Sequence, residues 1–88
     1  MSNYSIVLSK KAQKQLDKFS DSIAFPILEQ IAQLEINPRP EGVKKLKGSS
    51  DAYRIRIGNY RVIYEIVDNL LIIDVITIAH RKDVYENY

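Results

Sequence analysis

The chain has 88 residues, of which 45 % are hydrophobic and 27 % charged, with a formal net charge of +2 and no cysteine. This composition is typical of an ordinary globular domain and argues against a disordered chain, a disulfide-rich scaffold and thiolate chemistry. The longest apolar stretch, residues 70–73, is far shorter than the roughly 20 residues of a membrane span, and residues 1–8 lack a signal-peptide pattern. We expect one domain over residues 1–88, cytoplasmic, with no membrane interaction and no cofactor.

The N-terminal third of the sequence predicts a strand followed by a helix. Residues 4–8 are apolar and rich in β-branched side chains, as strands are. Ser9 suits a helix N-cap, and the apolar residues after it recur at helical spacing over residues 10–18.

A second apolar stripe predicts another helix, from Ser20-Asp21-Ser22 to about Glu35. Pro26 lacks a backbone N–H, so this helix either begins near Ser22 or kinks at the proline. The Pro- and Gly-containing residues 37–42 end it.

After residue 51 the apolar residues alternate with polar ones, which predicts strands. Gly58-Asn59 suits a two-residue turn, so residues 53–57 and 60–66 form a tight hairpin. Asp68-Asn69 predicts a second turn, and the apolar run of residues 70–78 predicts a strand inside the sheet. The predicted order is βααβββ, an α+β fold with a small, mostly antiparallel sheet and a two-helix hairpin packed on one face.

Positive charge is concentrated between residues 44 and 61, which contain six Lys or Arg residues and one Asp. This segment has a net charge of +5, and the rest of the chain sums to −3. A basic segment in a nearly neutral protein marks a surface where a polyanion can bind, although a solvated basic face has the same composition.

The predicted hairpin places two arginines opposite each other. With a two-residue turn, Arg56 faces Arg61 on a surface that also carries Arg54, while the other surface is apolar and covers the helices. Directly opposed like charges cost about 0.2–1 kcal/mol, so we expect an anion bound between the two guanidinium groups. The alternative is that Glu65 or Asp74 bridges them.

Extending this register predicts that Arg61 faces Ile76 and that His80 points to the arginine face. Arg81 and Tyr85 follow in the tail, where they can fold over the edge of that face. The expected result is a shallow, open cationic platform with one imidazole and nearby phenols. Such a platform suits phosphate contacts and base stacking.

Three segments resemble, in order and spacing, the RelE family of toxins from prokaryotic type II toxin–antitoxin modules. They are KLKG at 45–48, YRIRIGNYRVIY at 53–64 and IAHRKDVY at 78–85. The resemblance covers nearly the whole chain and implies a RelE-like fold. It implies an endoribonuclease, an mRNA interferase that enters the ribosomal A site, cleaves the mRNA codon and inhibits translation. It also implies a cognate RelB-like antitoxin that blocks the toxin, and operator DNA binding only by their complex.

The resemblance also implies roles for individual positions. The basic residues that would hold RNA are Lys45, Lys47 and Arg54. The residues that would act on the substrate are Arg56, Arg61, Arg81 and Tyr85. Arg61 would contact the scissile phosphate, Arg81 would protonate the leaving oxygen and Tyr85 would stack on or orient the nucleotide. The best-known family member has lysines in place of Arg54 and Arg56, and an arginine is a poor general base but a good phosphate clamp.

Metal-free RNA cleavage needs a base for the 2′-hydroxyl, positive charge for the phosphorane and an acid for the 5′-oxygen. His80 is the only histidine, the residue type that most readily exchanges protons near neutral pH, so we expect it to be the base, with Tyr85 as the rival. Arg81 or a water supplies the acid. One His and scattered acids do not form a metal-ligand set, so no metal is expected. Because the ribosome would position the substrate, we expect negligible cleavage of free RNA.

Three other functions are compatible with the same residues. The related ParE branch shares the fold and the antitoxin pairing but inhibits DNA gyrase without nuclease activity. A non-catalytic nucleic-acid-binding module would use the same basic strands. An inert scaffold would use the opposed arginines to hold an acidic antitoxin helix.

Overall fold

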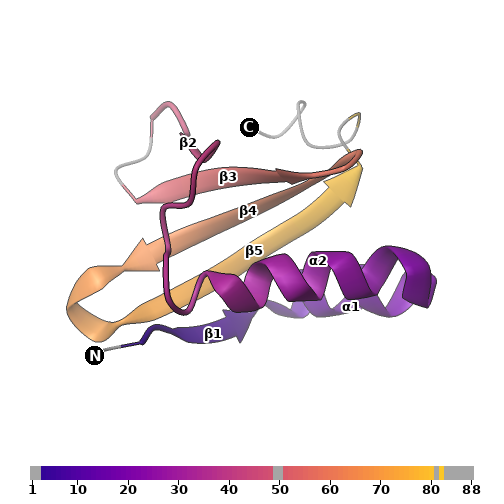
Figure 1. Ribbon diagram of the computed structural model, residues 1–88, viewed down its shortest axis with the longest axis horizontal. Helices are drawn as coiled ribbons and strands as arrows, with labels where there is room; N and C mark the ends of the chain where they lie inside the picture. Colours follow the sequence, from indigo (N-terminus) through magenta and orange to yellow (C-terminus); the bar gives the residue numbers. More distant parts are fainter. Residues whose placement is uncertain (1–2, 49–50, 81, 83–88) are drawn as a thin grey trace.

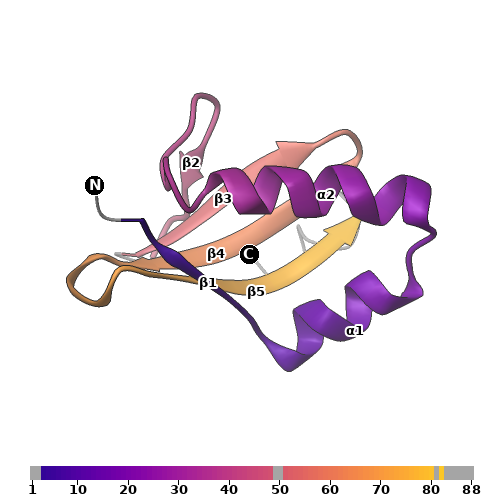
Figure 2. The same cartoon turned by 60° about the horizontal axis from the view of Figure 1, so that its bottom comes forward.

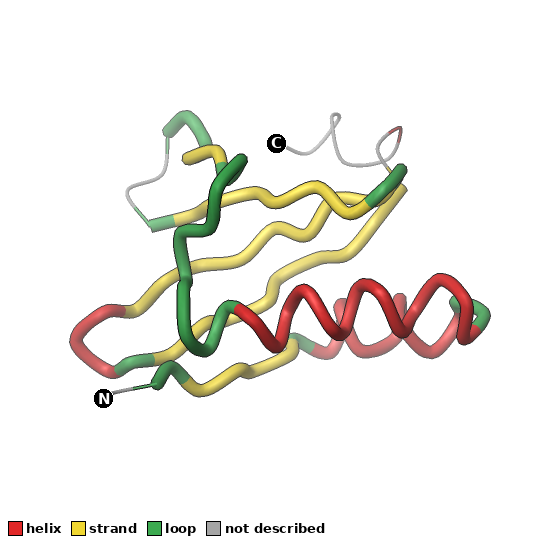
Figure 3. Tube along the Cα trace, viewed as in Figure 1, coloured by secondary structure: helices red, strands yellow, loops and turns green. Residues whose placement is uncertain are grey.

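The computed structural model describes residues 3–48, 51–80 and 82. In chain order the elements are β1 (Ser5–Leu8), α1 (Lys10–Lys18), α2 (Asp21–Gln33), β2 (Lys44–Lys45), β3 (Ala52–Ile57), β4 (Tyr60–Val67), the 3₁₀ helix η1 (Asp68–Leu70) and β5 (Ile72–His80). The predicted order is confirmed, with the two-residue strand β2 as an addition that the sequence pattern did not predict. Figure 3 shows these elements along the chain.

The five strands form one sheet in the order β1-β5-β4-β3-β2 (Figure 1). Strand β1 pairs in parallel with β5, and the other neighbours pair antiparallel. Strand β5 therefore lies inside the sheet, as its apolar run predicts. The α+β fold with a mostly antiparallel sheet is confirmed.

Both helices cover the same face of the sheet (Figures 1 and 2). The core between these layers is formed by buried apolar side chains from both helices and from β3, β4 and β5. Its largest members include Leu16, Ile27, Ile31, Leu34, Ile55, Val62, Tyr64, Ile66, Ile73, Val75 and Ile78. The apolar face of the hairpin thus packs against the helices, as predicted. No helix in the described ranges is both long enough and apolar enough to cross a bilayer.

Helix α1 has the predicted bounds because Ser9 caps it. The Ser9 hydroxyl oxygen accepts a hydrogen bond from the Ala12 N–H at 3.0 Å, and the hydroxyl donates to the Ile76 carbonyl at 2.7 Å. Gln15 then joins the helix to the part of the β5 edge that β1 does not cover, where its Oε1 accepts the Ile78 N–H at 2.6 Å. These contacts satisfy backbone groups of β5 beyond the end of β1.

Helix α2 begins at Asp21, close to the predicted start, and continues through Pro26 to Gln33. The proline lies in the second turn, where its missing N–H leaves the Ser22 carbonyl without the usual intrahelical donor. The helix is retained because Ala24, Ile27 and other residues on its inner face are buried against the sheet.

The predicted register between β4 and β5 is wrong. Arg61 pairs with Ala79 and not with Ile76. The connection between the strands comprises residues 68–71 instead of two residues, which shifts the pairing by two positions and preserves the faces. A β-bulge between Ile63 and Tyr64 then adds one residue to β5. A shift by one residue moves every later side chain to the other face of the sheet.

Candidate nucleic-acid interface

The opposed arginines of the β3–β4 hairpin are confirmed. Arg56 and Arg61 are direct partners across the two strands. Side chains at such positions have Cβ atoms about 4.5–5.5 Å apart and point to the same face, here the face away from the helices. This pair is the centre of the candidate interface, which we call the arginine face: Arg54 and Arg56 on β3 and Arg61 on β4.

The arginine face is not the uniformly open platform that the sequence predicts. Arg56 is exposed and Arg54 is partly exposed, but Arg61 is only 3 % exposed. Ile63, the next residue of β4 on the same side, is also fully buried. Arg61 lies on β4, the middle strand of the sheet. The accessible cationic groups are therefore concentrated on β3.

The predicted alternative, a carboxylate bridge between the opposed arginines, is not observed among the described residues. Glu65 faces Asp74 across β4 and β5, so these two carboxylates form a second pair of opposed like charges in addition to the arginine pair. The single ion pair between described residues joins Arg39 to Asp68, at the other end of the hairpin. Neither Glu65 nor Asp74 therefore bridges the arginines of the hairpin.

A hollow of about 360 Å³ lies at the edge of β3 beside Arg56. Three cationic side chains line it, from Lys44, Arg54 and Arg56, together with one carboxylate, Glu41. Strand β2 pairs with only two residues of β3, Tyr53 and Arg54, so no strand of the described residues pairs with that edge of β3 beside Arg56. The hollow combines three positive charges with space for a phosphate or a small anionic group.

Sequence reasoning missed Lys44 and selected its neighbours. Lys44 pairs with Arg54 and shares its face, whereas Lys45 pairs with Tyr53 and shares the opposite face. Lys45 and Lys47 are exposed but are not among the residues that line the hollow. Successive side chains of a strand point to opposite faces, so only one of Lys44 and Lys45 can share the face of Arg54. Which of the two does so is known only from the pairing of β2 with β3.

His80 does not lie on the arginine face, which corrects the sequence-based expectation. It pairs with Tyr60, and the two rings meet edge to face with centroids 5.6 Å apart. The Tyr60 ring also meets the ring of Phe19 edge to face on the helix side of the sheet, and these two ring centroids are 5.1 Å apart. The Nδ1 atom of His80 accepts the Lys82 N–H at 3.3 Å. The bulge in β5 is what turns His80 to the helix side of the sheet. The other two predicted catalytic residues of the tail, Arg81 and Tyr85, lie outside the described residues.

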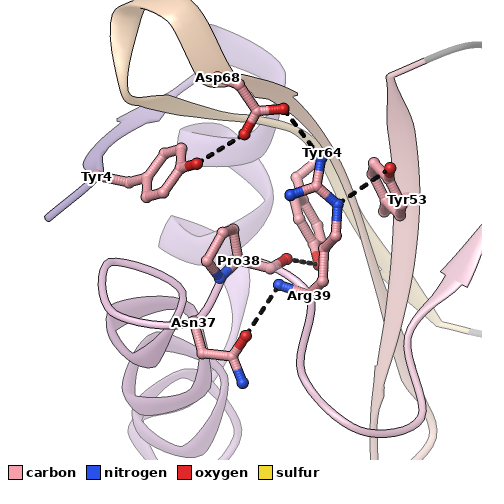
Figure 4. A network of polar contacts seen from close by, with 7 residues as sticks. All are labelled: Tyr4, Asn37, Pro38, Arg39, Tyr53, Tyr64 and Asp68. Carbon is pink, nitrogen blue, oxygen red and sulfur yellow. Dashed lines mark hydrogen bonds and ion pairs between the residues drawn. The ribbon is translucent and has the colours of Figure 1, made fainter. Parts of the chain in front are cut away.

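A polar network holds the α2–β2 connection against the sheet (Figure 4). The Arg39 Nη2 donates to Asp68 Oδ2 at 3.0 Å, and its Nε donates to the Tyr53 hydroxyl at 3.2 Å. The Tyr4 hydroxyl donates to the other oxygen of Asp68 at 2.6 Å. The hydrogen bond from Arg39, followed by that from Tyr4, lowers the pKa of Asp68 below its ordinary value. We call these four residues the Arg39 network.

The same connection is fixed by a buried phenol. The Tyr64 hydroxyl donates to the Pro38 carbonyl at 2.7 Å, and burial raises the pKa of Tyr64 above its ordinary value. Residues 40–42, which follow directly, line the cationic hollow. The network therefore positions one wall of the hollow, and sequence reasoning did not identify any of its contacts.

The chemistry of the interface is that of anion binding. Guanidinium groups bind phosphate oxygens with two parallel hydrogen bonds and keep their charge at any physiological pH. Within the described ranges, no group of three or more His, Asp or Glu side chains is arranged to hold a metal ion. The arrangement is suited to binding and stabilising a phosphodiester.

Comparison with known proteins identifies the family to which this chain belongs. Residues 6–85 match the family model described as the ParE toxin of the type II toxin–antitoxin system parDE, so the chain belongs to the RelE/ParE superfamily of type II toxins. It is RelE-like within that superfamily. A Methanocaldococcus jannaschii sequence assigned as the toxin RelE1 is 33 % identical over 87 residues, which cover 96 % of this chain and 97 % of that sequence.

Solved structures give the same result. A chain in the archaeal RelE–RelB complex from Pyrococcus horikoshii superimposes with a TM-score of 0.81 at 30 % identity, covering 93 % of this chain and 99 % of that one. The isolated RelE toxin of Escherichia coli gives a TM-score of 0.78 at 25 % identity, with 94 % and 92 % covered. The protein is therefore a RelE-like type II toxin in fold and family.

Proposed function

We propose that this toxin is a ribosome-dependent mRNA endoribonuclease that cleaves codons in the A site and thereby inhibits translation. The observation that carries the proposal is the direct pairing of Arg56 with Arg61 on the face of the sheet away from the helices. The likeness to RelE toxins supports it. The complexes of relatives with RelB support a cognate RelB-like antitoxin for this chain. We further propose, as the family resemblance implies, that the toxin acts in the cytoplasm and that operator DNA is bound only by the toxin–antitoxin complex.

The reaction is an attack by the ribose 2′-oxygen on its own 3′-phosphate. The new bond joins the 2′-oxygen to phosphorus, the bond to the 5′-oxygen breaks, and the products are a 2′,3′-cyclic phosphate and a free 5′-hydroxyl. Negative charge increases on the phosphorane oxygens in the transition state. We propose that the exposed Arg56 opposes this charge by direct contact and that Arg61, which is 3 % exposed, contributes through its electrostatic field. Arg54 holds the RNA backbone beside them, with Lys44 added by the register of β2. Lys45 and Lys47 are proposed to contact the RNA outside the arginine face.

Two proton transfers complete the reaction. Since His80 lies on the helix face, we assign the base that accepts the 2′-hydroxyl proton to Tyr85, the alternative that the sequence already offered. A tyrosine accepts this proton as the phenolate, a form that positive charge nearby favours in general. Arg81 or a water molecule donates the proton to the leaving 5′-oxygen. No metal or other cofactor takes part in this scheme.

The decisive experiment maps cleavage sites on an mRNA that is being translated in a reconstituted system. We expect cuts in phase with the codons when ribosomes, mRNA and toxin are all present, and negligible cleavage of the same RNA without ribosomes. Arg56→Gln should reduce the cleavage rate at least tenfold. Intact mRNA on translating ribosomes at stoichiometric toxin would contradict the proposal.

Gyrase inhibition is the second candidate, because the matching family model is that of ParE toxins. Purified gyrase and supercoiled DNA test it directly. Under this candidate, the toxin produces linearised DNA in stalled gyrase complexes and leaves translated mRNA uncut. The nuclease proposal predicts the reverse pattern for the same toxin preparation.

A further inference from the structure

Helix α1 carries a second basic surface that the arginine face does not include. Its four lysines are all exposed, and at 3.6 residues per turn they fall within an arc of about 100°. They line a hollow of about 420 Å³ together with Gln15. The four residues are Lys10, Lys11, Lys14 and Lys18, which we call the α1 lysine surface.

No carboxylate within the described ranges forms an ion pair with these lysines. The single ion pair found there involves Arg39 and Asp68, on another part of the molecule. Asp17 is the one acidic residue of α1, and its Oδ1 accepts a hydrogen bond from Gln13 Nε2 at 3.0 Å. The four exposed lysines therefore outnumber the single carboxylate of α1 on this side of the helix.

The two lysines in the first turn of α1 oppose the stability of the helix, whereas Lys18 in the last turn is favourably placed. The first turn of α1 contains no acidic residue and two lysines, next to the positive end of the helix dipole. Lys10 and Lys14, and then Lys14 and Lys18, stand four residues apart, a spacing at which like charges repel. A sequence selected only for folding would place acidic residues in the first turn, so the lysines indicate a bound anion.

The α1 lysine surface is separate from the arginine face. Helix α1 packs against β5 and β1, whereas Arg54 and Arg56 lie on β3, toward the other edge of the sheet. Figure 2 shows α1 below β5, away from β2 and β3. The helices also cover the opposite face from the one on which the arginines lie. One short RNA segment in the candidate site cannot also occupy this surface.

We propose that the α1 lysine surface binds the phosphate backbone of structured RNA, as a second contact beside the candidate site. Lys10, Lys14 and Lys18 follow one another at a rise of about 6 Å along the helix axis, a regular row that suits a backbone of repeating charges. The inference rests on the proposed function for the source of that RNA, which is ribosomal.

An acidic protein partner fits this surface less well. Protein interfaces use buried aromatic or aliphatic anchors and are depleted in lysine. The exposed side of α1 has no apolar side chain, since its apolar residues Ala12 and Leu16 are buried in the core. Lysines without an apolar anchor are characteristic of non-specific contacts to a nucleic-acid backbone.

The test compares charge removal with charge retention on α1. The triple variant Lys10→Gln, Lys14→Gln, Lys18→Gln should bind salt-washed ribosomes and a 20-base-pair RNA duplex at least tenfold more weakly than the unmodified toxin. The slope of log affinity against log salt should fall by about two to three, one phosphate contact per lysine. The matched Lys→Arg triple variant should retain both affinity and slope. Asp17→Asn, which preserves the side-chain geometry, should strengthen binding.

Two further measurements separate RNA binding from misfolding and from binding of an acidic protein. The Gln variant should unfold at the same or a higher temperature, because the unfavourable charges of the first turn are removed. Unchanged affinity and salt slope in the Gln variant would overturn the proposal. Lost binding to poly-glutamate with unchanged binding to the RNA duplex would also overturn it and assign the surface to an acidic protein.

The two proposals fail in different ways. If the toxin leaves translated mRNA intact but the Gln variant loses duplex affinity, the nuclease function is wrong and the α1 lysine surface stands. If the toxin cleaves translated mRNA and the Gln variant binds duplex and ribosomes like the unmodified toxin, the lysine surface is wrong and the nuclease function stands.

Discussion

Arg56 and Arg61 face each other across the β3–β4 hairpin, although each would be more stable opposite an acidic or neutral side chain. We predict that Arg56→Gln raises the free energy of unfolding by about 0.2–1 kcal/mol because it removes this repulsion. The same change should lower ribosome-dependent cleavage at least tenfold. Urea unfolding and a single-turnover cleavage assay measure the two effects.

A second like-charge pair in the sheet supplies the control. Glu65 faces Asp74, so Glu65→Gln should also raise stability by about 0.2–1 kcal/mol. It should leave cleavage unchanged, because no phosphate binds to a carboxylate pair. Loss of stability in Arg56→Gln would mean that the arginine pair is not repulsive in the folded toxin.

The hairpin register could be predicted because a two-residue loop fixes it. Gly58 adopts φ of +60°, which glycine accepts without strain, and every pair from Ile57–Tyr60 onward follows from that turn. The helices could be predicted from the Ser9 cap and from apolar spacing. These features are encoded by residues that are close in sequence.

The register beyond the hairpin has no comparable local signal. Leu71 adopts φ of 55°, a left-handed conformation that leucine rarely takes, so nothing in the sequence indicated the longer connection after Asp68. The bulge at Ile63 and Tyr64 also lacks a turn-type signal in the sequence, and it moved His80 to the opposite face from the one expected. The partner of Arg39 was equally hidden, because an exposed loop arginine acquires one only when the chain folds.

The position of His80 gives a prediction that separates structure from catalysis. His80→Gln removes the edge-to-face contact with Tyr60 and should cost about 0.5–1.5 kcal/mol of stability. Its cleavage rate and pH–rate profile should stay close to those of the unmodified toxin. Tyr85→Phe should abolish cleavage with ribosome binding retained. A flattened pH profile in His80→Gln would instead return the general base to the histidine.

The Arg39 network predicts how stability depends on acid. The folded-state pKa of Asp68 is lowered, so its contribution is present above about pH 4, the ordinary value of an aspartate, and is lost as the pH falls through the folded-state pKa. Asp68→Asn should therefore be less stable than the unmodified toxin at pH 7, and the difference should disappear toward pH 2. Chemical unfolding at several pH values measures it.

Asp17→Asn is the matched control for this experiment, since Asp17 is exposed and forms no ion pair with a described residue. Its stability curve should run parallel to that of the unmodified toxin from pH 7 to pH 2. A constant difference between Asp68→Asn and the unmodified toxin across this range would show that the carboxylate charge is not what holds Arg39.

The buried Tyr64 phenol predicts that the stability of the folded toxin falls as the pH rises in the alkaline range. Burial raises its folded-state pKa, so the folded toxin binds the phenolic proton more tightly than the unfolded chain does. The resulting stability is present below about pH 10 and is lost as the pH rises further. Tyr64→Phe should cost about 0.5–1.5 kcal/mol at pH 7 through loss of the hydrogen bond to Pro38, and its stability should fall less steeply above pH 10. Tyr60→Phe, at a partly exposed position, should keep the steep alkaline fall.

Pro26 predicts a gain in stability. It lies inside α2, exposed, and has no N–H for the Ser22 carbonyl. Pro26→Ala supplies that donor and a better helix former, so we expect about 1–3 kcal/mol of added stability in urea unfolding. Pro26 also lines a hollow beside the hairpin turn with Gly58 and Asn59, and Ala removes part of that wall. Unchanged or lower stability in Pro26→Ala would mean that contacts of the proline ring with the hairpin outweigh the missing hydrogen bond, and the hairpin turn would then depend on α2 for its position.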